Sequence, residues 1–394
     1  MHQGKYDALA TKFVSEALTT DVFLETGENW VEAFENKFAK KLGANYGIAV
    51  NSATSGLHAG LIAAGVGPGD EVISPGLTVI MDAFSTIYTG AIPVFCDVSP
   101  ETWNLDLDKV QSLITKKTKV IISVSWYGLP TDNKRLREIC DANGLILIDD
   151  SAETISTQDL VIANWRHAHL RVFSFESKKH FSTGGEGGMV LTDDPNLASK
   201  VRKAAGLGYK HLNANKGRTS LASRVFQNPS YERFDSVGLN YRMTPVTASI
   251  GLAQLERLEF LLQSRTKSAN LFQETTKSFE WLDRQPPTVN GMNHTYYTFG
   301  LFLDPENSLK VSWQQIYDAY TSNGGHGFYA NCMNPYLEPV LQGKRFSGQH
   351  FVEGLCPVAE KLQKGIMAFK TNYLDMRIAQ EQSEILGKVL GELE

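Results

Sequence analysis

Two short apolar segments of this chain each lead into residues whose side chains can do covalent chemistry. Asp150 and Glu153 follow the apolar run 145–148. Ser174 and Lys179 lie within and just after a second apolar run. A lysine amine can form a Schiff base, a serine hydroxyl can bind a phosphate, and an aspartate can keep a pyridine nitrogen protonated. Together these groups predict a site for pyridoxal phosphate.

The elements that must position these groups can be read from hydrophobic pattern. Short apolar runs predict strands at residues 71–74, 93–98, 120–126, 145–150, 171–175 and 189–192. Segment 133–143 between two of them predicts a helix that ends at Gly144. Such alternation predicts an α/β fold, with a mostly parallel sheet covered by helices on both faces. Ligands of these sheets bind at the carboxyl ends of the strands, where Asp150 lies.

The composition narrows the class of protein. The 394 residues are 42% hydrophobic and carry a net charge of -5, which argues against nucleic acid or an acidic membrane as the partner. The four cysteines have neither disulfide nor zinc spacing, so we expect reduced thiols and no metal site. No signal peptide and no apolar run of about 18 residues is found. We therefore expect a soluble, cytoplasmic protein.

Small and hydroxyl residues precede the helix-like stretch 57–64. Thr54 and Ser55 stand at this expected helix N-terminus, where free backbone N–H groups and hydroxyls attract anions. An ordinary N-cap explains the same residues equally well. The spacing is not that of a Walker loop, and no Gly-x-Gly-x-x-Gly follows a strand here. The segment therefore suits a phosphate group but not a nucleoside triphosphate loop.

Lys178 and Lys179 stand between an aromatic strand end and the glycine-rich stretch 184–188. Most adjacent lysines are solvated, but this setting favours a lysine held near a cofactor. Burial lowers the pKa of such a lysine, so that its amine can act as nucleophile and then carry a proton. Lys178 and His180 are the rival candidates within the motif. No Gly-x-Ser-x-Gly, His-Glu-x-x-His or Cys-x-x-Cys motif competes with it.

The chain changes character beyond the expected sheet. Segment 206–236 is polar and turn-rich, which predicts a long loop. Its basic cluster suits a pyrophosphate or a carboxylate, or is simply solvated; it consists of Lys210, His211, Lys216, Arg218, Arg224 and Arg233. A buried helical stripe is predicted from the spacing of Leu252, Leu255, Leu258 and Leu262. We expect a large domain over residues 1–250 and a smaller α+β domain over residues 251–394.

Several ordered blocks of the chain resemble the DegT/DnrJ/EryC1/StrS family of sugar aminotransferases. The similarity extends from about residue 28 to residue 260 and is weak beyond. The matching blocks are Ser52-Ala-Thr-Ser-Gly-Leu-His, Gly67-Pro-Gly-Asp-Glu-Val-Ile, Pro93-Val-Phe-Cys-Asp-Val, Trp126-Tyr-Gly, Gly238-Leu-Asn-Tyr-Arg-Met and Ile250-Gly-Leu-Ala-Gln-Leu. Blocks in family order and spacing are far more specific than any one of them.

The resemblance implies the aspartate aminotransferase (type I) fold and pyridoxal 5′-phosphate as cofactor. It implies a homodimer with active sites at the subunit interface. By position, it makes Lys179 the Schiff-base lysine, Asp150 the partner of the pyridine nitrogen and Glu153 the group near the ring hydroxyl.

The same resemblance implies where the cofactor phosphate binds. Ser174 and the turn at Thr54 and Ser55 would hold it within one subunit. Asn240 would reach the phosphate of the neighbouring subunit's cofactor.

Three departures from the family pattern bear on these assignments. The glycine stretch is one residue longer than usual, so counting back from it arrives at His180, whereas counting forward from Ser174 arrives at Lys179. We prefer Lys179 because a loop absorbs an extra glycine easily. Val79 stands where many members stack an aromatic ring on the cofactor, and Glu153 stands where glutamine is common.

Residues and resemblance together favour an aminotransferase in which Lys179 is a buried, neutral amine at working pH. The implied donor is L-glutamate. The implied acceptor is a keto-sugar, either nucleotide-linked or acidic, such as an 8-oxo-3-deoxy-octulosonate of lipopolysaccharide. The alternatives are a pyridoxamine-phosphate-dependent deoxysugar 3-dehydrase, a cyclitol (inosose) aminotransferase and a regulator that senses the cofactor. Residues of the second domain that are candidates for substrate contact are Tyr296, Tyr297, Tyr329 and Asn331.

Overall fold

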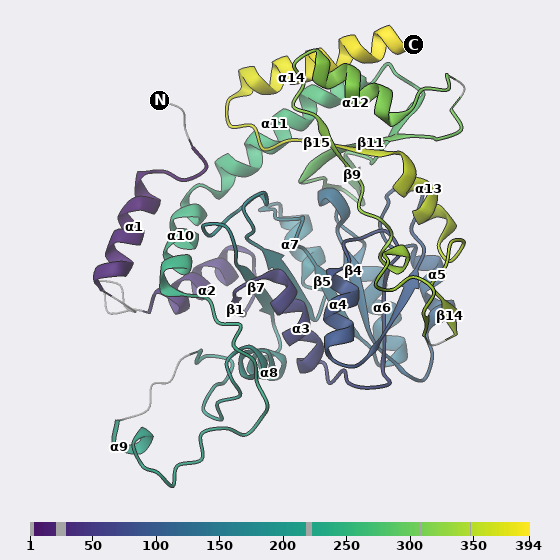
Figure 1. Ribbon diagram of the computed structural model, residues 1–394. Helices are drawn as coiled ribbons and strands as arrows, with labels where there is room; N and C mark the ends of the chain where they lie inside the picture. The colour runs from purple at the N-terminus through teal and green to yellow at the C-terminus, as the bar shows by residue number, and fades with distance from the viewer. Residues whose placement is uncertain (1–3, 21–28, 218–222, 308, 347) are drawn as a thin grey trace.

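A computed structural model describes residues 4–20, 29–217, 223–307, 309–346 and 348–394 (Figure 1). The helices of this part of the chain are α1 (Ala8–Thr19), α2 (Trp30–Lys41), α3 (Ala53–Ala63), α4 (Met81–Tyr88), α5 (Leu107–Leu113), α6 (Asn133–Asn143), α7 (Asp159–Trp165), α8 (Pro195–Ala205), α9 (Ser223–Phe226), α10 (Pro245–Glu256), α11 (Leu258–Thr276), α12 (Trp313–Ser322), α13 (Pro357–Gly365) and α14 (Met376–Leu393). Single 3-10 turns lie at Trp126–Gly128 and Pro335–Leu337. None of these helices is both long and apolar enough to cross a lipid bilayer.

Seven strands form the central sheet, in the order β1-β7-β6-β5-β4-β2-β3. They are β1 (Tyr46–Val50), β2 (Glu71–Pro75), β3 (Ile92–Cys96), β4 (Thr118–Val124), β5 (Ile146–Asp150), β6 (Leu170–Ser174) and β7 (Gly188–Thr192). Strands β2 to β6 pair in parallel, whereas β7 is antiparallel to both β1 and β6. The predicted mostly parallel sheet and its six predicted strands are confirmed. Strand β1 was missed, although it is as long as most of the predicted strands.

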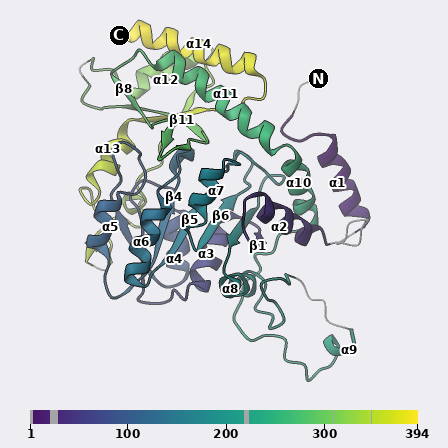
Figure 2. The same ribbon diagram turned by 180° about the vertical axis from the view of Figure 1, so that it is seen from behind.

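The central sheet separates two hydrophobic cores, because alternate side chains of a strand point to opposite faces. In β4, Val120 and Ile122 pack into the core beneath α3 and α8, whereas Ile121 packs into the core beneath α5 and α6. Phe38 of α2 and Trp165 of α7 extend the second layer. Figures 1 and 2 show the two helix layers from opposite sides. Burial of each such side chain stabilises the fold by about 1.5–3 kcal/mol.

Local signals determine where two helices near the site begin or end. The predicted helix 133–143 is confirmed as α6, and Gly144 ends it with a φ of 66° in the left-handed region. Helix α3 begins at Ala53, earlier than the expected stretch, because the Ser52 side chain caps it.

A second, antiparallel sheet lies above the central one in Figure 1, in the order β12-β15-β11-β8. Its strands are β8 (Leu282–Arg284), β11 (Thr298–Leu303), β12 (Phe328–Ala330) and β15 (Ile366–Lys370). It shares a hydrophobic core of its own with α11, α12 and α14. Two short hairpins complete the described strands, β9 (Thr288–Val289) with β10 (Met292–Asn293) and β13 (Arg345–Phe346) with β14 (Gln349–His350).

Helix α10 leads into α11 with only Arg257 between them, and so connects the two sheets. The predicted stripe is confirmed, since Leu252, Leu255 and Leu258 are buried and Leu262 is half-buried. Residue 250 lies inside α10. The domain limits 1–250 and 251–394 stay a prediction.

The C-terminal part of the chain also returns to the edge of the central sheet. The side-chain amide of Gln349 bonds to both backbone groups of Phe95 in β3, at 2.8 and 2.7 Å. Asp97 accepts the backbone N–H groups of Val358 and Ala359 at the start of α13, at 3.2 and 2.9 Å. These bonds hold the second sheet over the carboxyl ends of the central strands.

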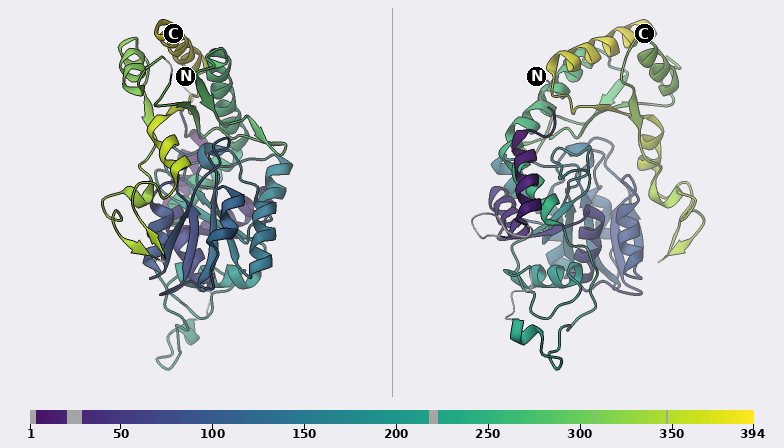
Figure 3. Two further views of the ribbon diagram at one scale, coloured as in Figure 1. Left: turned by 90° about the vertical axis from the view of Figure 1, so that its right-hand side faces the viewer. Right: turned by 60° about the vertical axis from the view of Figure 1, so that its left-hand side comes forward.

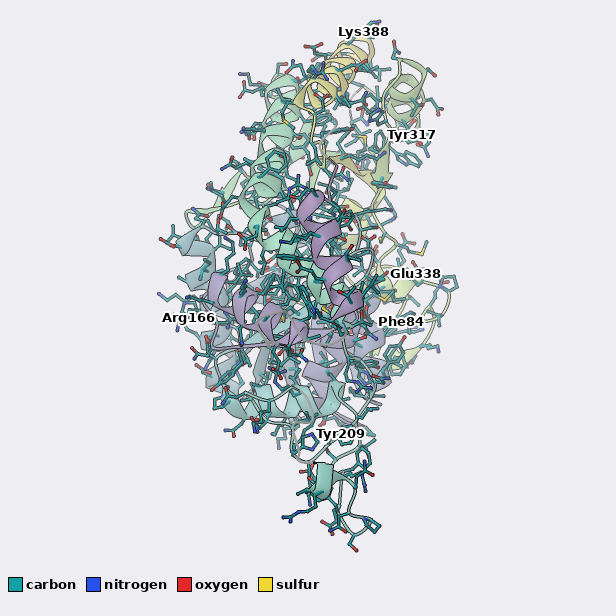
Figure 4. The ribbon with its side chains drawn as sticks, turned by 90° about the vertical axis from the view of Figure 1, so that its left-hand side faces the viewer. Phe84, Arg166, Tyr209, Tyr317, Glu338 and Lys388 are labelled. Atoms are coloured by element: carbon teal, nitrogen blue, oxygen red, sulfur yellow. The ribbon has the colours of Figure 1, made fainter. Side chains whose placement is uncertain are left out.

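The described residues 206–217 and 223–244 form a segment that projects from the opposite end of the molecule from α14 (Figure 3). Figure 4 labels Tyr209 where this projecting segment leaves the body. Its described residues contain the short helix α9 and isolated bridges that join Tyr209 to Phe234 and Gly206 to Asn240. The predicted long loop is therefore confirmed for the part of it that the structure describes.

Candidate active site

The carboxyl ends of β4, β5 and β6 border a cavity of about 540 Å³ beneath the second sheet. Its walls combine residues that follow these strands with residues of the second sheet, among them Trp126, Glu153, Lys179, Tyr297, Tyr329 and Lys370. This is the edge of the sheet where the sequence predicts a ligand.

Lys179 and Glu153 face each other in this cavity. Lys179 Nζ donates to Glu153 Oε1 at 3.2 Å, and the backbone N–H of Tyr127 donates to Glu153 Oε2 at 3.0 Å. Lys179 Nζ also lies 4.1 Å from the centroid of the Tyr297 ring. The side chains of Lys179 and Glu153 are 15% and 9% exposed. The expected burial of Lys179 is therefore confirmed.

The pKa of Lys179 differs from the expectation. Burial alone lowers the pKa of Lys179, but the Glu153 carboxylate, helped by Tyr297, outweighs burial and holds this pKa above its ordinary value. The predicted lowered pKa, and with it the predicted neutral amine, is wrong for this arrangement. The sequence pattern could not reveal that Glu153 forms an ion pair with the amine.

Lys179 and His180, the two rivals for the Schiff-base position, point to different places. Lys179 extends into the cavity, whereas His180 Nε2 bonds to the backbone carbonyl of Thr295 at 2.8 Å. Burial lowers the pKa of His180 well below its ordinary value. Gly184 and Gly185 of the glycine stretch have φ values of 95° and 130°, which favour glycine and suit a loop that absorbs an extra residue. This geometry supports the register that ends at Lys179.

Asp149 and Asp150 end β5 with their side chains on opposite faces of the sheet, as strand alternation predicts. Asp150 Oδ1 accepts the N–H of Ala152 at 2.9 Å, whereas Asp149 Oδ2 accepts from Asn133 of α6 at 2.7 Å. Both carboxyls are buried, and burial raises the pKa of Asp150 to about 6 and the pKa of Asp149 to about 7. Asp150 therefore remains largely ionised at neutral pH, favoured by nearby Lys179.

Three segments converge at the N-terminus of α3. Ser52 Oγ accepts the N–H of Ser55 at 3.1 Å, and Thr54 is half-buried in the same turn. Gly188 approaches so closely that a Cβ there would lie 2.7 Å from the Ser52 carbonyl carbon. Sheet pairing places Ser174 opposite Gly188. The predicted phosphate residues Thr54, Ser55 and Ser174 are thus brought to one place.

Asn240 lies outside the Lys179 cavity. It is exposed, and its Oδ1 accepts the Arg242 Nε at 3.0 Å. Both residues line a separate cavity of about 390 Å³ beside β1. The expected contact of Asn240 with a neighbouring subunit's cofactor stays a prediction.

The basic cluster of the projecting segment does not contribute to the Lys179 cavity within one chain. None of its described members lines that cavity. Lys210 Nζ pairs with Glu232 of the same loop at 3.4 Å. This contact is the one expected if the basic loop is simply solvated. Arg218 lies outside the described residues.

The tyrosines that the sequence singled out lie in β12 of the second sheet or just before β11. Tyr297, Tyr329 and Asn331 line the cavity. Tyr296 does not, because its ring is buried against His294 with the ring centroids 4.1 Å apart. Tyr296 as a substrate contact is therefore wrong, since neighbouring residues leave the backbone in different directions.

Tyr127 is a site residue that sequence reasoning missed. Its φ of 55° is unusual for a residue with a side chain, and this conformation directs its N–H to Glu153. Its hydroxyl donates to Asn331 Oδ1 at 2.9 Å. The Trp126-Tyr-Gly block is the sequence signal that could have identified it.

Arg265 of α11 was also missed, and no local signal marks it. Its guanidinium is buried and donates to the carbonyls of Tyr297 and Lys178, so it ties the second sheet to the lysine loop. Burial lowers the pKa of Arg265 to about 10. The arginine therefore remains charged at neutral pH.

These groups fit pyridoxal phosphate. The close approach of Gly188 leaves the first turn of α3 lined by backbone and hydroxyls, which suits a phosphate. A buried lysine and a buried aspartate supply the other two groups. Val79 lines the cavity without an aromatic ring, but Trp126 and Tyr127 also line it. Among the described residues, no three His, Cys, Asp or Glu side chains are grouped to hold a metal ion.

Comparisons with known proteins agree with this geometry. The profile of the DegT/DnrJ/EryC1/StrS aminotransferase family matches residues 5–379. The chain is 37% identical over 270 residues to the GDP-perosamine synthase of Caulobacter vibrioides, which is 68% of each chain. It is 35% identical over 313 residues to the spore coat polysaccharide biosynthesis protein SpsC of Bacillus subtilis, covering 79% of this chain and 78% of that one.

Solved structures share the fold at lower identity. An aminotransferase from Psychrobacter cryohalolentis superposes with a TM-score of 0.86 at 24% identity, over 98% of both chains. An E. coli GDP-4-keto-6-deoxy-D-mannose-3-dehydratase with bound hydrated PLP superposes with a TM-score of 0.82 at 21% identity, again over 98% of both. The chain therefore belongs to the DegT/DnrJ/EryC1/StrS family and is a pyridoxal-phosphate-dependent aminotransferase with the type I fold.

Proposed function

We propose that this enzyme transfers an amino group from L-glutamate to a keto-sugar, in the cytoplasm, for surface polysaccharide or lipopolysaccharide synthesis. The names of its relatives, GDP-perosamine synthase and a spore coat polysaccharide protein, support a sugar acceptor. The observation that carries the proposal is the buried pair of Lys179 and Glu153 in a cavity of about 540 Å³. A cavity of this size suits a small-molecule substrate.

The proposed chemistry assigns one task to each charged group. Pyridoxal phosphate, when bound, supplies an electron sink for the amino carbon of the substrate. Lys179 would hold the cofactor and, as a free amine, would carry a proton to and from that carbon. Glu153 orients the amine, and the N–H of Tyr127 orients Glu153. Asp150 keeps the pyridine nitrogen protonated.

The phosphate site of the proposal is shared between two subunits. Thr54, Ser55 and Ser174 hold the phosphate in one subunit, and Asn240 completes the site of the neighbouring subunit in a homodimer. The projecting segment that carries Asn240 exposes apolar side chains, with Phe234 55% and Val237 95% exposed in the single chain. A second copy that covers them would remove this apolar surface from water.

The mouth of the cavity is positively charged. Lys178 and Lys370 flank the ring of Tyr329, with their Nζ atoms 5.2 and 5.8 Å from its centroid. An anionic group of the substrate would therefore bind there. The carboxylate of the donor meets this requirement, and so does the phosphate of a nucleotide-linked sugar or the carboxylate of an acidic sugar.

The test is the absorption spectrum of the purified protein before and after L-glutamate is added. We expect a visible band from lysine-bound cofactor that glutamate converts to the band of the amino form. Lys179→Ala should abolish the visible band, whereas the matched control Lys178→Ala should keep it. A keto-sugar that accepts the amino group should bring the visible band back. The rate of this return, compared between nucleotide-linked and acidic keto-sugars, ranks the two classes of acceptor.

One pattern of results would overturn the proposal. In that pattern the purified protein carries only the amino form of the cofactor, its spectrum and activity do not change in Lys179→Ala, and its activity is lost in His180→Asn. That outcome would favour the 3-dehydrase alternative.

A further inference from the structure

Asp82 of α4 is a second buried carboxyl beside Asp150, and nothing so far gives it a role. It is 0% exposed. Thr78 Oγ1 donates to Asp82 Oδ2 at 2.8 Å. Asp82 Oδ1 is buried and receives no hydrogen bond from any described residue. Besides Thr78, the carboxyl of Asp150 lies within hydrogen-bonding reach of the Asp82 carboxyl.

Two carboxyls in contact in a buried site cannot both be ionised, so they must share a proton. Burial, together with the charge of Asp150, raises the pKa of Asp82 well above its ordinary value. Burial raises the pKa of Asp150 only to about 6, because the Ala152 N–H and Lys179 favour its charged form. The polar and charged groups that face the pair are Thr78, Ala152, Glu153 and Lys179. At neutral pH the proton therefore resides on Asp82.

We propose that Asp82 is a positioning residue for the cofactor's pyridine nitrogen, with its protonated carboxyl donating a hydrogen bond to the carboxylate of Asp150. The inference rests on the proposed role of Asp150. Because Thr78 already donates to Oδ2, that oxygen acts as the carbonyl oxygen and Oδ1 carries the proton. The proposed bond also gives a partner to Asp82 Oδ1, which is buried and has no hydrogen-bond partner in the described part of the chain.

The hydrogen bond from Asp82 has two consequences for Asp150. It holds the carboxylate in one orientation, in addition to the bond from the Ala152 N–H. It also makes Asp150 a weaker base, because a hydrogen bond to the charged form favours that form. The proton shared between Asp150 and the ring then stays on the ring nitrogen, where the chemistry needs it.

Two substitutions separate a neutral donor from an ionised group. Asp82→Asn keeps the shape and an N–H donor, whereas Asp82→Leu keeps neither. The readout is the pH titration of the visible band of the bound cofactor. If Asp82 is neutral, Asp82→Asn titrates within about 0.3 pH units of the wild type, whereas removal of a nearby buried charge would shift the titration by about one unit or more. A shift of that size would overturn the proposal.

The loss of the donor should also weaken cofactor binding. We expect Asp82→Leu to lower the affinity of the cofactor-free protein for pyridoxal phosphate by about fivefold or more, the effect of one lost hydrogen bond. Asp82→Asn should retain the wild-type affinity. Equal loss of affinity in both variants would contradict the donor role. If Asp82→Leu does not fold, Asp82→Asn still carries the test.

A third readout needs no cofactor. The infrared carbonyl band of a protonated buried carboxyl should be present at neutral pH in the cofactor-free protein and reduced in Asp82→Asn. The matched control is Asp149→Asn, which changes the adjacent buried carboxyl on the other face of β5; because the pKa of Asp149 is about 7, this variant should lose the part of the intensity that belongs to Asp149 and keep the Asp82 band. No loss of intensity in Asp82→Asn would show that Asp82 is ionised.

The response of the wild-type spectrum to glutamate tests the proposed function independently of these variants.

Discussion

The cavity around Lys179 and the cavity beside Asn240 differ in how their charged groups are satisfied. In the Asn240 cavity, the Arg202 guanidinium bonds to Glu35, to the Gly47 carbonyl at 2.9 Å and to the Ala214 carbonyl at 3.1 Å. All of these partners belong to the same chain. Each of the three guanidinium nitrogens bonds within the described part of the chain, so the ion pair acts as part of the wall.

The Lys179 cavity differs because its amine lines the open space and has spare donors. Among the described side chains, only Glu153 accepts a hydrogen bond from Lys179 Nζ. Both cavities could hold a small molecule by volume. Unsatisfied polar groups that converge on a space identify a site better than its size does.

The largest expected effect tests the structural role of the Asn240 cavity. Arg202→Met leaves Glu35 buried without its partner, and breaking a buried ion pair costs about 3–5 kcal/mol. We expect the free energy of unfolding by urea to fall by that amount while the cofactor spectrum of the folded protein is unchanged. The double variant Arg202→Met/Glu35→Gln should recover part of the loss. Unchanged stability with lost cofactor binding would make this cavity functional.

The next effect tests the proposed phosphate site at the N-terminus of α3. Gly188→Ala would place a Cβ 2.7 Å from the Ser52 carbonyl carbon, so the start of α3 must move. Such overpacking costs about 1–3 kcal/mol, which corresponds to about a fivefold to 150-fold loss of affinity for pyridoxal phosphate if it falls on the bound state. Fluorescence titration of the cofactor-free protein measures it. Gly67→Ala, where a Cβ has open space, is the control and should bind normally.

A smaller effect tests the ion pair of Lys179. In the cofactor-free protein, Glu153→Gln removes the carboxylate that raises the lysine pKa and leaves burial, which lowers it. The pH dependence of pyridoxal phosphate capture should therefore move to lower pH by about one unit or more. Glu101→Gln, which neutralises an exposed carboxylate that does not line the cavity, serves as control. A profile that does not move would contradict the ion pair.

The sign of the stability effect follows from the raised pKa. The ion pair contributes stability at pH values below the ordinary lysine pKa of about 10.4, and this contribution is lost as pH rises through the higher folded-state pKa. In neutral buffers, the stability of the cofactor-free wild type should therefore not depend on the titration of Lys179.

The smallest effect concerns the bond between the two walls of the Lys179 cavity. Tyr127→Phe removes the hydrogen bond to Asn331 Oδ1, which should lower the free energy of unfolding by about 0.5–1.5 kcal/mol. A double-mutant cycle with Asn331→Ala measures the coupling. Fully additive effects would mean that the bond contributes nothing.

Much of the site was predictable because its residues follow local patterns. Apolar runs that end in polar residues located Asp150 and Ser174 at the ends of β5 and β6. A helix N-terminus rich in hydroxyls located Thr54 and Ser55, and strand alternation separated Asp149 from Asp150. These signals depend on residues that are neighbours in sequence, so a single sequence can carry them.

The sequence by itself determined the α/β class, the strand ends and the set of candidate groups for the cofactor. Only the tertiary structure decided which of them meet: Glu153 with Lys179, Asp82 of α4 with Asp150 of β5, and Tyr297 but not Tyr296 with the cavity. The pKa of Lys179 follows from the first of these contacts. The physical reason is that burial and charge act over a few ångströms in space, and helix packing on the sheet sets those distances.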